Sequence, residues 1–329
     1  MVQSALDCIS QIIRAFRHIK AGSALFPWRP AGNLRLALLL VSGLVMLSLA
    51  GTLVGCRSSP SSASAEVSAA SQAIENKGSD TLVNLALAWA EAYMALHPEV
   101  RISVTGGGSG TGIAAMINGT VDIANASRAM KPEEIADAQS NGITPVEFVV
   151  ARDAIAVVVH PSNPVDRLTL QQISDIYTGR ITNWSQVGGE DRPIVLLSRE
   201  SNSGTYVYFL ENVIRLGDQD SDLLFSPDTL LMPSSEGISA EVRQNPNAIG
   251  YDGLGYVTAD QKTLAVAQDA GGPYVLPSAG TVNNGSYPIS RPLYMYTAGE
   301  PTGSIEAYLD WIMDEGQTLV EQLGFVPLQ

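Results

Sequence analysis

Four short segments of the chain combine hydroxyl side chains, arginines and glycines in a pattern that suits the binding of an oxyanion. Their hydroxyl and guanidinium groups belong to Ser79 and Thr81, Ser109 and Thr111, Ser127 and Arg128, and Arg199, Ser203 and Thr205. Hydroxyls donate hydrogen bonds, and a guanidinium is a permanently charged donor. A tetrahedral dianion accepts about a dozen hydrogen bonds, which four such segments can supply.

Residues 106–112, with the sequence GGGSGTG, form the most distinctive of these segments. They stand between an expected strand and an expected helix, so several backbone N–H groups are left free at the positive end of the helix dipole. The segment lacks the lysine of the GxxxxGK[ST] phosphate loop and offers no GxGxxG register, so neither an NTPase nor a dinucleotide motif is supported. Taken alone, it is equally compatible with a flexible turn.

The order of the expected elements brings the four segments together. Each follows a strand and leads into a helix, and in open α/β sheets such turns gather at the carboxyl ends of the strands, where ligands bind. A single segment of this kind most often only caps its helix. Four segments of the same design favour a shared anion site.

Length and charge limit the classes of function. The 329 residues are enough for two modest domains, and the formal net charge is −14. Residues 1–56 carry five basic residues against one acidic residue, so the remainder carries −18. So acidic a body argues against nucleic acid as a partner and against a basic membrane-binding face. An anionic ligand must therefore be captured by local dipoles and a few arginines.

The N-terminal region has the features of an export signal. Residues 36–54 form a mostly apolar run of about twenty residues, which is long enough to cross a bilayer or to serve as a signal-peptide core. The run ends in Leu53-Val54-Gly55-Cys56, which resembles a lipobox. We therefore expect residues 1–56 to be a signal peptide with lipidation at Cys56, and residues 57–72 to be a flexible Ser/Ala tether. An uncleaved N-terminal anchor is the alternative.

Hydrophobic patterning predicts an α/β fold with a largely parallel sheet. Strands are expected at residues 73–76, 100–104, 121–124, 146–150, 155–159, 194–197, 248–251, 254–257 and 293–296. Helices are expected at residues 82–96, from 113 onward, and at 132–139, 170–177, 206–214, 235–244 and 305–313. The only cysteines are Cys8 and Cys56, so the body after the signal peptide has no disulfide.

In combination and order, these motifs resemble the phosphate-binding proteins of bacterial ABC-type phosphate importers (PstS-like proteins). The resemblance covers the chain from about residue 74 to the C-terminus. It is carried by residues 77–82, 106–112, 126–128, 179–184, 199–205, 248–251 and 287–294. It implies a two-lobed periplasmic-binding-protein fold of type II, with two α/β lobes joined by two crossing segments. We expect lobe I to hold residues 73–152 and 258–329, and lobe II to hold residues 153–257.

The resemblance also implies that phosphate is held in the cleft between the lobes. The full set of expected ligand-binding residues is Ser79, Asp80, Thr81, Ser109, Gly110, Thr111, Ser127, Arg128, Asp153, Arg199, Ser203, Gly204 and Thr205. Some members of the family carry an aspartate where this chain has Arg128. That aspartate accepts the proton of monohydrogen phosphate and thereby rejects sulfate. The acceptor must then come from elsewhere, and Asp153 and Asp80 are the candidates; Asp153 is equally suited to be the structural partner of an arginine.

The resulting hypothesis is a lipid-anchored, monomeric phosphate-binding protein that delivers its ligand to a membrane permease, with no catalytic residue, metal or cofactor. A binding protein for sulfate, phosphonate or molybdate is the alternative within the same class. A phosphomonoesterase or another phosphate-handling hydrolase on this scaffold is the alternative from a different class. The sequence shows neither a nucleophile paired with a base nor a metal-ligand spacing, which disfavours the hydrolase. A sensory or adhesive surface lipoprotein is a third possibility.

Overall fold

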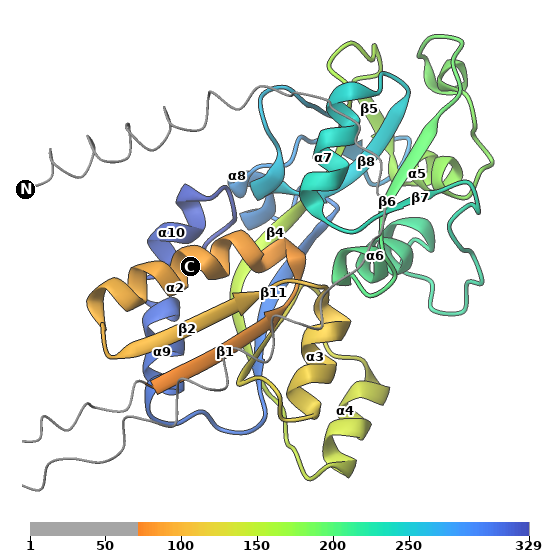
Figure 1. Cartoon of the computed structure of the whole chain (residues 1–329). Helices are drawn as coiled ribbons and strands as arrows, with labels where there is room; N and C mark the ends of the chain where they lie inside the picture. Colours follow the sequence, from red (N-terminus) through yellow and green to blue (C-terminus); the bar gives the residue numbers. More distant parts are fainter. Residues whose placement is uncertain (1–71, 329) are drawn as a thin grey trace, which may run out of the picture. The chain divides into compact units, whose positions relative to one another are not determined.

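A computed structural model describes residues 72–328 of the chain (Figure 1). The predicted signal peptide, the lipidation site Cys56 and the tether up to residue 71 lie outside the described residues. Within residues 72–328, no helix is long and apolar enough to cross a membrane.

One mixed sheet runs through the described chain, in the order β2-β1-β3-β11-β4-β8-β6-β7, with β9 also paired to β4. The strands are β1 (Gln72–Gly78), β2 (Val100–Thr105), β3 (Ile123–Ala126), β4 (Val146–Val159), β6 (Val195–Arg199), β7 (Leu230–Met232), β8 (Ala248–Gly253), β9 (Lys262–Thr263) and β11 (Ser290–Thr297). β1 is parallel to β2 and β3, and β6 is parallel to β7 and β8. β4 and β11 are antiparallel to their neighbours, so the expected parallel order holds within each half of the sheet but not across its centre.

Strand β4 joins the first half of the sheet, which contains β1, β2 and β3, to the second half, which contains β6, β7 and β8. Its residues 146–154 pair with β11, and its residues 155–159 pair with β8. The two apolar runs that were expected to form separate strands are therefore one strand of 14 residues. Figure 1 shows β4 and β11 lying side by side between the two groups of elements.

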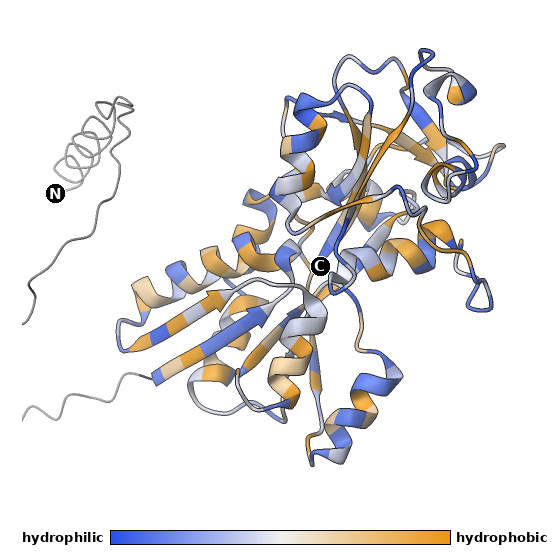
Figure 2. Cartoon of the chain, turned by 45° about the vertical axis from the view of Figure 1, so that its right-hand side comes forward, coloured by the Kyte–Doolittle hydropathy of each residue, from blue (hydrophilic) through white to orange (hydrophobic). Residues whose placement is uncertain are grey.

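The helices pack against the sheet or against one another. They are α2 (Val83–Leu96), α3 (Ser109–Ile117), α4 (Pro132–Ser140), α5 (Leu170–Tyr177), α6 (Gly204–Phe209), α7 (Ser235–Gln244), α8 (Ala279–Asn283), α9 (Ser304–Met313) and α10 (Gln317–Gln322). In α2 the spacing of Leu85, Trp89 and Tyr93 puts all three into the core of the first half. Figure 2 shows both hydrophobic and hydrophilic residues along the helices, as expected for helices with one buried face.

Residues 262–289 pack differently from the expected division into lobes. β9 pairs with β4, and β10 (Ala265–Ala267) pairs in parallel with β5 (Arg167–Thr169). Leu264, Val266 and Ile289 belong to the same buried cluster as Ile155 and Tyr177. Residues 262–289 therefore pack with the second half, whereas the sequence predicted that lobe I resumes at residue 258. Pairing between strands that are far apart in the chain determines this packing, and such pairing leaves no local pattern in the sequence.

Three further differences concern single elements. Leu254–Tyr256 is a 3-10 helix (η5) that follows β8 directly, not a strand. The expected helix at 206–214 begins earlier, at Gly204, and its last turn, from Leu210 to Ile214, is π-helical. The expected closing helix is followed by one more, α10.

Candidate functional site

The structure brings hydroxyls from all four predicted segments into contact. The Thr81 and Thr205 hydroxyl oxygens lie 2.8 Å apart, and those of Ser109 and Ser127 lie 3.3 Å apart. Thr81 follows β1, whereas Thr205 lies in the first turn of α6, after β6. All four side chains are buried. We call these four residues the hydroxyl cluster.

Gly204 allows the halves to meet at this cluster. A Cβ atom at this position would overlap the Ser109 hydroxyl and lie 2.6 Å from the Ser127 hydroxyl. Glycine is therefore needed here for close approach and not for an unusual backbone angle. The sequence placed Gly204 in the site on the strength of family resemblance, and its position beside both serines gives that prediction a physical reason.

Arg291, on β11, is the central cation of the cluster. Its Nη2 donates to Thr205 Oγ1 at 2.9 Å and to Asp153 Oδ2 at 3.1 Å, and it lies 3.4 Å from Thr81 Oγ1. Its Nη1 donates to the backbone oxygen of Ser127 at 2.8 Å. Sequence reasoning did not assign Arg291 to the site, although the segment 287–294 contributed to the resemblance. No glycine turn or hydroxyl pattern of the predicted type surrounds it, so its role depends on the pairing of β11 with β4.

Asp153 is the ionic partner of Arg291. Its carboxyl is fully buried, and Oδ1 accepts a hydrogen bond of 3.1 Å from the Leu254 N–H. Burial raises the pKa of Asp153, while the neighbouring Arg291 guanidinium acts in the opposite direction. Both of its oxygens are thus occupied by protein donors, in agreement with the alternative that Asp153 is an arginine's structural partner.

Arg199 occupies the other side of the site. Its Nη2 lies 3.2 Å from Asp80 Oδ2, and its Nη1 donates to Ser235 Oγ at 3.0 Å. The same Asp80 oxygen accepts a 2.9 Å hydrogen bond from the Ser235 N–H. Asp80 precedes α2, and Ser235 begins α7, so this group ties the first half to the second.

Arg128 is paired away from the cluster. Its two terminal nitrogens donate to the two Glu134 oxygens at 2.8 and 2.7 Å, a bidentate arrangement. Burial tends to raise the pKa of Glu134, but hydrogen bonds from Arg128 and from the Lys131 N–H outweigh it, and the pKa lies below its usual value. The predicted second cation of the site is therefore neutralised by a carboxylate in the first turn of α4.

The glycine-rich segment contacts the loop before α6 directly. The Gly110 N–H donates to the Asn202 carbonyl at 3.1 Å, and Asn202 Nδ2 donates to the Gly107 carbonyl at 2.9 Å. Gly108 has a φ of 93°, and a Cβ there would lie 2.7 Å from the Asn202 oxygen. Asn202 was missed because an asparagine in a polar loop carries no signal by itself.

The remaining predicted residues lie around the cluster in different ways. Thr111 is half-buried on α3. The Ser203 hydroxyl accepts from the Thr205 N–H at 3.2 Å and caps α6, as a single segment of this type often does. The Ser79 hydroxyl is buried and has no hydrogen-bond partner among the described residues.

Other buried polar atoms near the cluster also have no partner among residues 72–328. They are Arg199 Nε, Arg291 Nε and Asp252 Oδ2. A buried donor or acceptor without a partner costs about 1–3 kcal/mol. Such atoms gathered beside a hydroxyl cluster mark the place as suited to a polar ligand.

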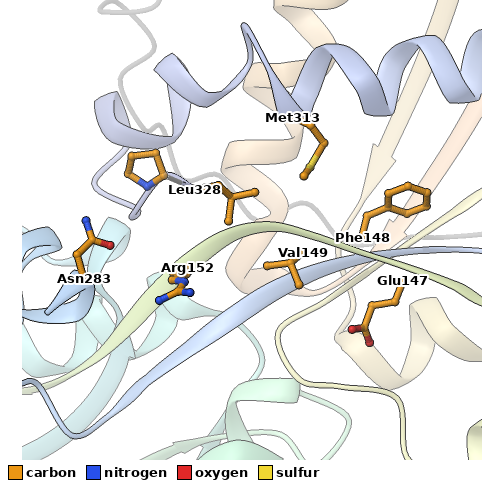
Figure 3. Close-up of a pocket in the computed structure, with 8 residues that line it drawn as sticks. Glu147, Phe148, Val149, Arg152, Asn283, Met313 and Leu328 are labelled. Carbon is orange, nitrogen blue, oxygen red and sulfur yellow. The ribbon is translucent and has the colours of Figure 1, made fainter. Parts of the chain in front are cut away.

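The cavities of the molecule are separate from the cluster or border it. A cavity of 480 Å³ lies against Phe148, Arg152 and Met313, and Figure 3 shows its side chains, none of which belongs to the predicted set. A cavity of 320 Å³ is lined by Arg128 and Arg291 together with Tyr208 of α6. Within the described residues, no group of three or more His, Cys, Asp or Glu side chains could hold a metal ion.

Comparison with known proteins identifies the family. A family model described as a PBP superfamily domain matches residues 63–315. The phosphate-binding protein PstS of Pseudomonas aeruginosa is 37% identical over 273 residues, which cover 78% of this chain and 83% of that protein. PstS of Bacillus subtilis is 30% identical over 298 residues, which cover 90% and 94%. This chain belongs to the PstS family.

Solved structures of PstS-type proteins agree with the fold. A substrate-binding protein assigned to phosphate ABC transport in Clostridium perfringens, with phosphate bound, is 34% identical, with a TM-score of 0.69 over 78% of this chain and all of that one. An ABC-type phosphate transport receptor from Vibrio cholerae is 28% identical, with a TM-score of 0.62 over 78% of this chain and all of that one. The predicted α/β periplasmic-binding-protein fold is confirmed.

Proposed function

We propose that this protein binds inorganic phosphate outside the cytoplasm and delivers it to the permease of an ABC-type phosphate importer. The observation that carries the proposal is the meeting of hydroxyls from both halves around Arg291. Thr81 and Thr205 come from different halves of the sheet, and the same guanidinium contacts both. Membership of the PstS family supports phosphate as the oxyanion.

The ligand site follows from the donors that face the cluster. The direct contacts we assign are Ser79, Thr81, Ser109, Ser127, Arg199, Ser203, Gly204, Thr205 and Arg291. Asp80 and Asp153 hold the two guanidinium groups in place, since a buried arginine is oriented by its carboxylate partner. Gly110, Thr111 and Arg128 support the rim of the site. Burial of a tetrahedral dianion is offset by charge-assisted hydrogen bonds to the two arginines.

Binding and release correspond to closure and opening of the two halves. A phosphate that contacts donors of both halves stabilises the closed form by its differential affinity for that form. The Asp80–Arg199 and Gly110–Asn202 contacts would separate on opening. β4 and β11 run between the halves and are the segments about which the halves would move.

The cellular arrangement rests on the sequence. Acylation of Cys56 would hold the protein at the outer face of the membrane, with residues 57–72 as the spacer that lets the folded part reach a permease. A monomer with one ligand suffices for this role.

Calorimetric titration of the purified, detergent-solubilised full-length protein with phosphate, arsenate, sulfate and molybdate tests the proposal. We expect one phosphate per chain, arsenate binding with it, and sulfate and molybdate failing to saturate the protein at the same concentrations. Saturation by molybdate or sulfate in place of phosphate would assign another oxyanion. Release of product from a generic phosphate ester would favour the hydrolase alternative.

A further inference from the structure

The cavity of 320 Å³ beside Arg291 is enclosed by both halves of the protein. The first half contributes residues 128–132, which follow β3, and the second half contributes Val207 and Tyr208 of α6. Residues of β11 form the third wall. A cavity of this volume has the size of a small-molecule site. Because its walls come from both halves, a molecule bound in it contacts both halves at once.

Two buried guanidinium groups line this cavity, and each has a donor to spare. Arg128 is 8% exposed and Arg291 is 3% exposed, and the Nε atom of each has no hydrogen-bond partner among residues 72–328. The terminal nitrogens of both side chains already donate to protein oxygens. A buried donor without a partner carries a cost in free energy that an acceptor atom of a ligand removes. The cavity therefore offers two donors to such an acceptor.

The charges around the cavity nearly balance. Each of the two guanidinium groups is paired with a carboxylate, and the lining also includes Lys131 of the first half and Glu211 of the second, which carry opposite charges. A dianion in the cavity would lack a matching excess of positive charge, and burying an unpaired charge is costly. A single negative charge, held by charge-assisted hydrogen bonds from guanidinium groups, is therefore the most that the cavity suits.

The remaining wall of the cavity is mostly apolar or aromatic. The Tyr208 phenol donates to the Ser290 carbonyl at 2.7 Å, and the centre of its ring lies 5.6 Å from the guanidinium carbon of Arg291. The other side chains of this kind are Met130, Pro132, Val207, Pro292 and Tyr294. An inorganic oxyanion accepts hydrogen bonds in all directions, which such a wall does not supply. A carboxylate uses the two spare donors and leaves its apolar part to the wall.

We propose that this cavity binds a small organic monocarboxylate with an apolar body, and that this second ligand favours the closed form of the protein. Its carboxylate accepts hydrogen bonds from Nε of Arg128 and of Arg291, and its apolar part packs against Val207 and the Tyr208 ring. No covalent bond changes.

The second ligand and phosphate are coupled through closure. Because the carboxylate contacts both halves, it binds the closed form more tightly than the open form and shifts the population toward closure. Phosphate also requires the closed form, so the carboxylate raises the affinity for phosphate, and phosphate raises the affinity for the carboxylate by the same factor. This coupling rests on the proposed phosphate binding, whereas occupation of the cavity by a carboxylate does not.

Calorimetric titration with phosphate tests the proposal on the detergent-solubilised full-length protein, in sodium benzoate or in sodium chloride of the same ionic strength. We expect saturating benzoate to raise the affinity for phosphate by about fivefold or more, which is the lower end of the usual range for coupled sites. Benzamide has nearly the same shape but no negative charge, so its effect should be much smaller.

Two substitutions of Val207 test whether the effect arises in this cavity. Val207→Phe adds a ring to the wall where the apolar part of the ligand would pack, so benzoate should lose its effect while phosphate alone binds nearly as in the parent. Val207→Ala leaves the cavity open and is the matched control, in which the effect of benzoate should remain. Thermal melting of both variants checks that they fold.

Each outcome decides a separate question. A parent protein that binds no phosphate removes the proposed function, and direct titration with benzoate then still tests the cavity. A parent that binds phosphate with the same affinity in benzoate and in chloride overturns the inference and leaves phosphate binding intact. Weaker phosphate binding in benzoate would mean competition at the hydroxyl cluster and overturns it as well. These comparisons need no variant, and an undiminished effect in a folded Val207→Phe protein would exclude this cavity as the site.

Discussion

At the scale of single residues, local chemistry in the sequence predicted that the hydroxyls and Arg199 would lie close together, but it did not predict their partners. Ser109, Ser127 and Thr205 sit in turns with a recognisable design, and the structure brings them together. Arg291 lies near the start of β11, two residues before the strand that the sequence predicted, and its role depends on the pairing of β11 with β4. Arg128 was predicted to be a ligand cation, but in the structure it donates two hydrogen bonds to Glu134, six residues later in the chain.

The Arg291–Asp153 pair permits a prediction about stability. Removing one partner of a buried ion pair leaves an uncompensated charge and costs about 3–5 kcal/mol, whereas replacing both partners by apolar residues is close to neutral. We expect Arg291→Met to lower the free energy of unfolding by such an amount and Arg291→Met/Asp153→Leu to recover most of it, as measured by urea denaturation. Neither variant should bind phosphate. A double variant as unstable as the single one would show that the pair is not the dominant interaction there.

At the scale of elements, the sequence predicted most accurately the helices that are defined by the spacing of neighbouring residues. The bounds of α5 and α7 agree with the expected ranges, because apolar spacing and capping residues define both helices. The split of β4 at Arg152 and Asp153 was an error with a physical cause, since two charged residues ordinarily end an apolar strand. Here Asp153 faces Arg291 across the register of β11, so the charge is compensated and the strand continues.

The start of α6 carries a prediction about closure. A methyl group at Gly204 would meet the hydroxyls of Ser109 and Ser127 only where the two halves are in contact. Gly204→Ala should therefore weaken phosphate binding by more than about tenfold, which corresponds to about 1.4 kcal/mol or more, while thermal stability changes little. Gly299→Ala is the matched control, because a Cβ at Gly299 has no neighbour within 4 Å. Titration and thermal melting of both variants give the comparison, and unchanged affinity in Gly204→Ala would remove the close approach from the binding mechanism.

At the scale of the whole molecule, membership of the PstS family and the joined halves agree with a protein that carries a ligand between them. The boundary between the halves could not be predicted, because β9 and β10 are short and are defined by partners about 100 residues away in the chain. The predicted division into lobes remains a prediction, with residues 262–289 now packed in the second half.

The predicted attachment to the membrane depends on residues outside the part of the chain that the structure describes. Replacing Cys56 with Ser removes the thiol that would be acylated and leaves residues 57–72 unchanged. We expect labelled fatty acid to mark the parent protein in cells and not the Cys56→Ser variant, and the variant to leave the membrane fraction. Equal labelling of both would exclude lipidation at this cysteine, and retention without any labelling would favour an uncleaved anchor.

The most direct test of the central claim is a crystal structure of the protein with arsenate, whose anomalous scattering locates the anion without ambiguity. We predict one arsenate per chain at the hydroxyl cluster, with its oxygens within hydrogen-bond distance of Thr81, Ser109 and Thr205 and of the Arg291 guanidinium. An arsenate bound elsewhere, for example in the cavity beside Arg152, or a cluster that stays without anion at saturating arsenate, would contradict the account.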